Sequence, residues 1–308
     1  MADFREKVLA RSSGILSYGL TPPRARHEAD ELAATAERQR AQIRSLPIDA
    51  VVLYDLQDES SRDASPRPFA FLPTLDPATY ARDYLGDVGR DLIVYRAVAN
   101  HREAEFAAWL SGADSAAEPA AVTFVGSPSR AQQPIAGLSL RRAYQLHSER
   151  CQRLLLGGIA IAERHAKSEN EHLRMLDKQA LGCSFFVTQA VYDTNATELL
   201  LADFARAAAE RGLPPAPVLL TITPCGSQKT LEFLKWLGIS FDPVIEQRLR
   251  QGNDMLRESI AICEQLILAF ASRRGPVPLG INVESVSIRR ADIEAALALV
   301  EFARRALG

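Results

Sequence analysis

The chain has 308 residues, 47% of them hydrophobic and 24% charged, which is the composition of a globular protein able to bury a large core. Its formal net charge of −2 gives no electrostatic reason to bind nucleic acid or an anionic membrane surface. No apolar run approaches the roughly 18 residues of a membrane span, and the first residues lack the apolar stretch of a signal peptide. We therefore expect a cytoplasmic protein. Its four singly spread cysteines predict reduced, mostly buried thiols instead of zinc ligands.

Eight apolar, strand-like runs alternate with helical stretches along the chain, after a short amphipathic helix over 2–12. The predicted strands cover 15–20, 48–54, 91–96, 120–125, 153–160, 183–189, 217–222 and 278–284. The predicted helices cover 25–43, 76–85, 101–110, 139–149, 168–181, 196–211, 227–237, 242–250, 253–273 and 289–307. This alternation predicts a parallel sheet, and eight units most simply close into one (β/α)8 TIM barrel over residues 1–308, with extra helices between strands 7 and 8. An open doubly wound sheet is the alternative, although the G-x-G-x-x-G fingerprint that it would often carry is absent.

Two loops are too long for tight connections between a strand and a helix. Residues 63–75 are rich in proline and phenylalanine, and residues 128–138 are rich in proline, glutamine and glycine. Loops of this length in a compact domain are usually functional. We interpret the first as a lid or an interface.

Polar side chains follow the strands at the end where parallel barrel strands surround a common mouth. In the first half these are Gly19, Thr21, Asp55, Gln57, Asp58, Glu59, Tyr95, Arg96 and Ser127. In the second half they are Glu163, Arg164, His165, Gln189, Thr221, Thr223, Gln228, Asn282, Glu284 and Ser285. The set predicts a binding cleft for a polyfunctional organic ligand or cofactor.

Other barrel chemistries are less well supported. A Schiff-base mechanism needs a lysine on a strand near the mouth, whereas every lysine falls in a predicted helix or a loop leading to one. A metal site of two histidines and a carboxylate needs more imidazoles than His165 alone, so we predict no metal. Considered alone, His165 also fits a structural loop histidine, and Glu171 and Lys178, seven apart, fit a solvated helix face.

Several motifs together resemble one enzyme family. Glu163-Arg-His165 after the fifth strand is followed by a helix with Lys178 and by a strand ending Val187-Thr-Gln189. Pro22-Pro23-Arg24 after the first strand, and a proline loop leading to Gln228, add weaker matches. The pattern resembles methylenetetrahydrofolate reductases, which are FAD-containing (β/α)8 barrels, over roughly residues 15–305.

The resemblance implies roles for individual residues. His165, Glu171 and Lys178 would face an FAD cofactor, together with Glu163 and with Ser127, which stands where the family has an aspartate. Gln189 would hold the pterin of a tetrahydrofolate derivative, and we add Gln228 and Glu284 as substrate-binding candidates at the mouth. NAD(P)H would be the co-substrate that reduces the flavin, and hydride would then pass between flavin and folate in one-carbon metabolism.

One departure from the family pattern concerns the chemistry itself. The family's glutamate on the first strand, a general acid, falls on Gly19, which cannot transfer a proton. One hypothesis is a divergent reductase in which Asp55, Asp58 or Glu59 replaces the lost acid. The other is a non-catalytic folate- or flavin-binding relative that depends on a partner subunit or forms a homo-oligomer. An unrelated barrel enzyme stays a third alternative.

Overall fold

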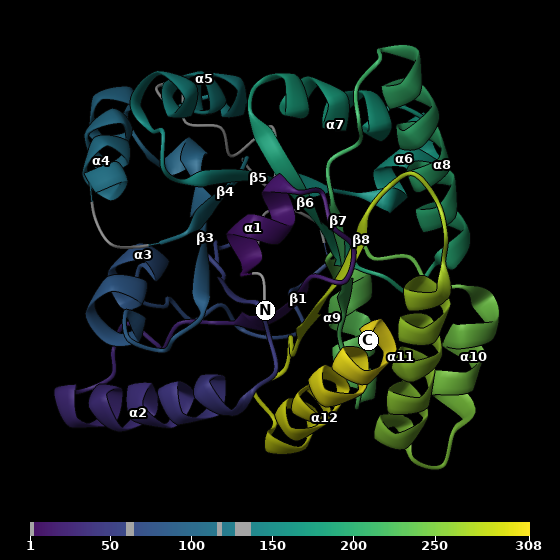
Figure 1. Ribbon diagram of the computed structural model, residues 1–308. Helices are drawn as coiled ribbons and strands as arrows, with labels where there is room; N and C mark the ends of the chain where they lie inside the picture. The colour runs from purple at the N-terminus through teal and green to yellow at the C-terminus, as the bar shows by residue number, and fades with distance from the viewer. Residues whose placement is uncertain (1–2, 60–64, 116–118, 127–136) are drawn as a thin grey trace.

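The computed structural model describes residues 3–59, 65–115, 119–126 and 137–308, and its eight parallel strands form a closed barrel (Figure 1). The strands are β1 Leu16–Leu20, β2 Ala50–Leu53, β3 Asp91–Ala97, β4 Ala121–Val125, β5 Leu155–Ala160, β6 Cys183–Ala190, β7 Val218–Ile222 and β8 Leu279–Glu284. They follow one another in chain order, and β1 pairs with both β2 and β8. The predicted (β/α)8 barrel is confirmed, and the open sheet is excluded.

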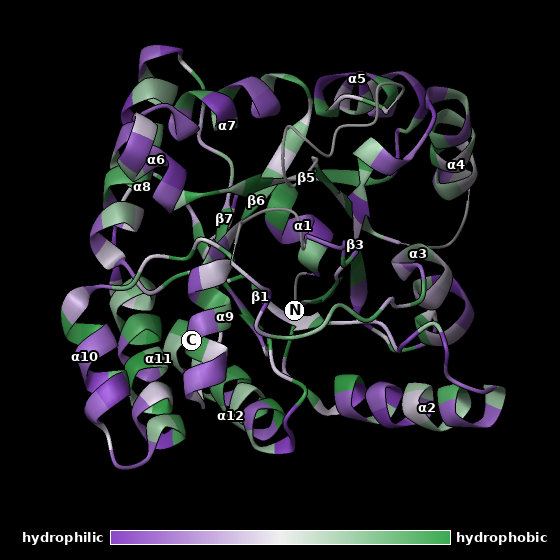
Figure 2. Ribbon diagram, turned by 180° about the vertical axis from the view of Figure 1, so that it is seen from behind, coloured by the Kyte–Doolittle hydropathy of each residue, from purple (hydrophilic) through white to green (hydrophobic). Residues whose placement is uncertain are grey.

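Helices surround the barrel and close its bottom. They are α1 Phe4–Leu9, α2 Ala29–Ser45, α3 Pro77–Tyr80, α4 Glu103–Ser115, α5 Leu140–Arg150, α6 Ala162–Ser168, α7 Glu171–Ala180, α8 Thr194–Glu210, α9 Gln228–Trp236, α10 Pro243–Gln251, α11 Met255–Ser272 and α12 Arg290–Leu307. Figure 2 shows apolar and polar residues alternating along them, as expected for amphipathic helices packed on a sheet. In the described part of the chain, none of the helices combines the length and the apolar character that crossing a membrane requires.

The sequence itself explains why the helices begin where they do. Asp193, Ser227 and Asp254 each precede a helix, and the side chain of each accepts a hydrogen bond from a backbone N–H of the first turn. Such caps satisfy groups that the helix leaves unpaired. As predicted, three helices, α9 to α11, separate β7 from β8.

One helix was not expected from the sequence. Residues 161–167 lie between the strand predicted over 153–160 and the helix predicted over 168–181, where a polar loop was expected, but Ala162–Ser168 forms α6. Alanine, glutamate, arginine and lysine are good helix formers, and a short helix satisfies their backbone groups beside the barrel. The correction matters because Glu163 and His165 then point in directions set by a helix and not by a strand end.

The short N-terminal helix closes the bottom of the barrel. Figure 1 shows α1 in front of the central strands, and its Phe4 and Val8 are buried. The Phe4 ring meets the Phe185 ring edge to face at 5.3 Å. These residues join the inward side chains of the strands in one apolar cluster, which is separate from the larger core between strands and helices. The opposite end of the barrel is therefore the end available to ligands.

Candidate ligand-binding site at the barrel mouth

The side chains that line the inside of the barrel follow from the two-residue period of a strand. On β2, the inward residues Ala50 and Val52 join the inner apolar cluster, and Tyr54 packs against it directly after the strand. On β8 the same period places Asn282 and Glu284 inward. Gly19 is the register partner of Glu284 across the β1–β8 pair. The uppermost layer of the barrel interior therefore contains Gly19, Tyr54 and Glu284.

Tyr54 and Glu284 fill the space beside Gly19. A Cβ atom added at Gly19 would lie 2.7 Å from Tyr54 Oη and 2.8 Å from Glu284 Cβ, both closer than real Cβ contacts allow. Glycine is thus required by packing at this position. A carboxyl group is still present in this layer of the barrel, but β8 supplies it instead of β1.

The surroundings of the Glu284 carboxyl group change its pKa. Burial raises its pKa to about 7, and a hydrogen bond with the Tyr54 hydroxyl opposes this rise. Burial and the nearby Glu284 hold the pKa of Tyr54 well above its ordinary value of 10, so Tyr54 remains a neutral hydroxyl. A carboxyl group with a pKa near neutrality can exchange a proton or accept hydrogen bonds under physiological conditions.

A chain of polar side chains below Glu284 fixes Tyr54. Asn282 Nδ2 donates to Tyr54 Oη at 2.9 Å and lies 3.2 Å from Thr221 Oγ1, while its Oδ1 accepts from Ser17 Oγ at 2.9 Å. The Tyr54 ring also meets the Tyr95 ring edge to face at 5.0 Å. Because Ser17, Thr221 and Asn282 are buried, these bonds hold Tyr54 in one orientation.

Gln189 lies at an irregular end of β6. The pairing of β6 with β7 shifts register between Val187 and Ala190, and Thr188 Oγ1 accepts a hydrogen bond from the Thr221 backbone at 3.0 Å. Bulges of this kind redirect side chains beside active sites. Gln189 is half-buried, and the alternation along β6 places it inward with Phe185 and Val187.

The side chains expected to face a flavin lie elsewhere. His165 Nε2 is 3.0 Å from Asp203 Oδ2 of α8, and the fully buried Glu171 accepts from Arg164 at 2.8 Å. Lys178 Nζ donates to the Ile159 carbonyl at 2.5 Å, and burial lowers its pKa. Their contacts join β5, α6, α7 and α8, whereas His165 Nδ1 and Glu171 Oε1 are buried without a hydrogen-bond partner among the described residues. FAD binding by these residues therefore stays a prediction from the sequence resemblance.

His165 also takes part in the arrangement closest to a metal site in the described chain. Donor atoms of His165, His172 and Asp203 all lie within 4.8 Å of one another. Asp203 is already paired with Arg206 at 2.6 Å as well as with His165. We assign the cluster to packing between the helices.

Glu163, another expected cofactor residue, contacts the segment that follows α9. Its Oε1 accepts a hydrogen bond from the Ser240 backbone at 3.3 Å, and burial raises its pKa. Ser240 follows α9, and its hydroxyl lies 3.2 Å from Asp193 Oδ2 after β6. Glu163 thus connects the ends of β5 and β6 to the segment after α9.

The acids expected from the β2 loop are arranged differently from Glu284. Asp55 accepts hydrogen bonds from the Ala97 backbone at 2.7 Å and the Gln57 amide at 2.6 Å, which link the end of β2 to β3. Burial raises the pKa of Asp55. Asp58 is exposed and Glu59 is half-buried, directly before the undescribed residues 60–64.

Gln228 and Ser127 were also predicted to be site residues. Gln228 is exposed at the start of α9 and donates to Glu232 at 3.1 Å. Ser127 lies outside the described residues. Conversely, the candidates predicted from the sequence did not include Tyr54, although it continues the inward alternation of Ala50 and Val52 and could have been found from that period.

A segment after β2 covers one side of the mouth. The Phe69 ring meets the Phe233 ring of α9 at 5.2 Å, and Trp236 Nε1 donates to the Ser65 carbonyl at 3.2 Å. The Arg67 guanidinium lies 5.7 Å from the centre of the Trp236 ring. Residues 65–71 follow β2 whereas α9 follows β7, so these contacts join parts of the rim that are far apart in the sequence. The described part of the loop predicted to be a lid or an interface is therefore packed against α9.

Comparison with solved structures gives the family. A protein from Clostridium thermocellum that binds two copies of 5-methyl-5,6,7,8-tetrahydrofolic acid is 36% identical, with a TM-score of 0.82. The alignment covers 98% of this chain and 99% of that one. The chain belongs to the family of this Clostridium protein. Neither a protein-family model nor a curated protein matches.

More distant structures share only the barrel. A GH113 β-1,4-mannanase aligns over 96% of this chain and 99% of its own, with a TM-score of 0.53 and 13% identity. At that identity the likeness shows the fold alone. The relationship to the Clostridium protein is much closer, because 36% sequence identity extends over nearly the whole of both chains.

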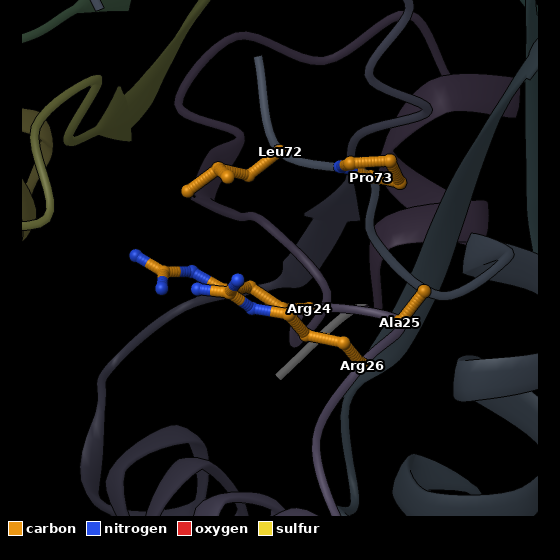
Figure 3. Close-up of a pocket in the computed structure, with 5 residues that line it drawn as sticks. All are labelled: Arg24, Ala25, Arg26, Leu72 and Pro73. Carbon is orange, nitrogen blue, oxygen red and sulfur yellow. The ribbon is translucent and has the colours of Figure 1, made fainter. Parts of the chain in front are cut away.

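In this member of the family, a pocket of about 390 Å³ lies at the rim, between the chain after β1 and the chain after β2. Arg24, Ala25, Arg26, Leu72 and Pro73 line it (Figure 3). The pocket is therefore next to the covering segment and on the mouth side of the barrel.

Proposed function

We propose that the protein binds a reduced folate at the barrel mouth, with Glu284 as the group that recognises the pterin. The observation that carries this proposal is the Clostridium relative, 36% identical over nearly the whole chain, which binds 5-methyltetrahydrofolic acid. The site chemistry agrees with it. The mouth combines the half-buried Glu284, whose pKa is raised, with the tyrosine hydroxyl of Tyr54 and the amide of Gln189.

Pterin chemistry explains the role of Glu284. The 2-amino group and the adjacent ring N–H of a pterin are paired donors, which an ionised carboxylate accepts through both oxygens, as it does with a guanidinium. Ligand binding would then favour ionised Glu284. Because the pKa of free Glu284 is about 7, affinity should rise between pH 6 and pH 8 and change little above that range.

Titration calorimetry with 5-methyltetrahydrofolate tests the proposal. The wild-type protein should bind, and Glu284→Gln should bind at least tenfold more weakly and lose the rise in affinity with pH, since a lost hydrogen bond to a charged group is worth about 1.5–3 kcal/mol. Glu301→Gln, exposed on α12, is the matched control. A wild-type protein that binds no reduced folate would overturn the proposal. The fitted stoichiometry also shows whether one or two molecules bind.

The second candidate is a catalytic relative that interconverts methylene- and methyl-tetrahydrofolate. The pKa of about 7 favours it, because protonated Glu284 could serve as the acid that the resemblance places at Gly19. FAD and NAD(P)H stay predictions here, and the visible absorption spectrum of the purified protein tests for flavin. Folate-dependent oxidation of NAD(P)H that falls about 10²-fold or more in Glu284→Gln would support catalysis. Binding without turnover would favour a non-catalytic role.

A further inference from the structure

Two arginines at the rim pocket have no acidic partner. Neither the Arg24 nor the Arg26 guanidinium has a hydrogen-bond or ion-pair partner within the described residues; Arg24 is half-buried and Arg26 is exposed. Figure 3 shows both side chains extending to the same side as Leu72. The nearby Asp76 is unavailable because it pairs with Arg96. Two positive charges without a compensating group among the described residues therefore lie at the edge of this largely apolar pocket.

The backbone around the pocket is held in place. Arg24 and Thr74 form an antiparallel bridge, the Ala25 N–H donates to the Pro73 carbonyl at 3.0 Å, and the Leu75 N–H donates to the Pro23 carbonyl at 2.9 Å. Proline restricts the backbone of both strands of this pair. The backbone that carries the two arginine side chains is therefore held in one conformation, which reduces the entropic cost of binding a ligand.

The pocket lies within reach of the Glu284 layer. Gly19 is the register partner of Glu284. Arg24 is five residues beyond Gly19, so the Cα atoms of Gly19 and Arg24 are at most about 18 Å apart. A reduced folate is an elongated molecule with a pterin at one end, an aryl ring in the middle and glutamate carboxylates at the other. Ala25, Leu72 and Pro73 provide an apolar wall beside the two charges.

We propose that Arg24 and Arg26 bind the carboxylates of the folate's glutamate tail, so that the protein selects folates by their tail as well as by their pterin. This inference rests on the proposed function. Guanidinium groups recognise carboxylates through two parallel hydrogen bonds, and a second arginine allows a tail of more than one glutamate to be held. Affinity should therefore increase with the number of glutamates.

The test compares three ligands by calorimetry: a tail-less tetrahydropterin, 5-methyltetrahydrofolate and its triglutamate. In the wild-type protein, affinity should rise in that order. The double variant Arg24→Gln/Arg26→Gln should lose at least tenfold in affinity for both tailed ligands and keep its affinity for the tail-less pterin. Arg38→Gln/Arg305→Gln, which removes two exposed arginines from α2 and α12, is the charge-matched control.

The outcomes separate the two proposals. Equal wild-type affinity for tailed and tail-less ligands, or an equal loss for all three in the double variant, would refute the tail site and leave pterin binding intact. A wild-type protein that binds none of the three would refute both. A double variant with an unchanged melting temperature confirms that the fold is not the cause of a selective loss.

Discussion

At the scale of single residues, the site depends on a pair from opposite ends of the sequence. Gly19 leaves the space that Tyr54 and Glu284 occupy, and a Cβ at residue 19 would come within 2.8 Å of Glu284 Cβ. The pair explains how a barrel can lack a carboxylate on its first strand and keep one in the same layer. It also makes the charge of Glu284 a property of the folded state, because burial raises its pKa.

This shift predicts how stability depends on pH. Because the pKa of Glu284 is about 7 in the folded protein and near 4.5 when unfolded, the folded state holds more protons between these values. The free energy of unfolding of the wild type should therefore fall, relative to Glu284→Gln, by about 2–3 kcal/mol from pH 5 to pH 8. Urea unfolding of both proteins at the two pH values measures the difference, and parallel curves would contradict the raised pKa.

Gly19 allows a second prediction from packing. Gly19→Ala should destabilise the protein by about 1–3 kcal/mol, because the added methyl group overpacks the Tyr54 and Glu284 contact. Gly112→Ala is the control: Gly112 lies inside α4 with open space around it, so alanine should stabilise by about 0.5–1 kcal/mol. Denaturant unfolding distinguishes the two. A neutral Gly19→Ala would show that the mouth layer is loosely packed.

At the scale of elements, the helix pair α6 and α7 determines what the Glu-x-His motif does. Because Ala162–Ser168 is helical, His165 turns toward Asp203 of α8, and Arg164 reaches Glu171 at the start of α7. Gly158 faces outward on β5, and a Cβ there would lie 3.3 Å from the Lys178 side chain. The motif therefore joins the outer helices to β5 in this protein.

If these contacts are structural, removing one should affect stability without affecting binding. Glu171→Gln should lower the free energy of unfolding by about 3–5 kcal/mol, because it leaves the largely buried Lys178 ammonium group without its carboxylate partner. The affinity of the folded protein for 5-methyltetrahydrofolate should not change. Glu294→Gln, which breaks an exposed pair with Arg290, should change stability by less than about 0.5 kcal/mol. A selective loss of affinity in Glu171→Gln would return this residue to the ligand site.

At the scale of the whole molecule, the two ends of the barrel have different roles. The bottom is closed by α1 and an apolar cluster, while the mouth gathers the carboxyl group, the covering segment and the rim arginines. In barrels of this kind, residues at the bottom serve stability and residues at the mouth serve function.

This division predicts that a bottom substitution leaves ligand affinity unchanged. Phe4→Ala should destabilise the protein by about 3–5 kcal/mol, because a fully buried ring that packs on Phe185 is lost. Leu9→Ala on the same helix, where the side chain is 61% exposed, should have little effect. Thermal unfolding and calorimetry at a temperature where both variants are folded give the two measurements. Weakened binding in Phe4→Ala would show that the two ends are coupled.

Much of the architecture followed from local patterns. The alternation of apolar runs with helical stretches predicted eight strands in the observed order, and the N-terminal helix and the three helices before β8 were also correct. Local patterns were less informative for residues 161–167, where polar helix formers resemble a loop. They also grouped every polar strand-end residue at the mouth, although His165 is held by Asp203 of α8.

The sequence by itself determined the barrel, its mouth and a set of polar candidates, because strand and helix periods depend on neighbouring residues. Only the tertiary structure decided which of those candidates meet. Barrel closure pairs β1 with β8 and so brings Glu284 against Gly19, and burial there moves the pKa of Glu284 to about 7. Pairing between strands at the two ends of the chain, and the loss of water around a carboxyl group, are properties of the closed barrel and of no local stretch.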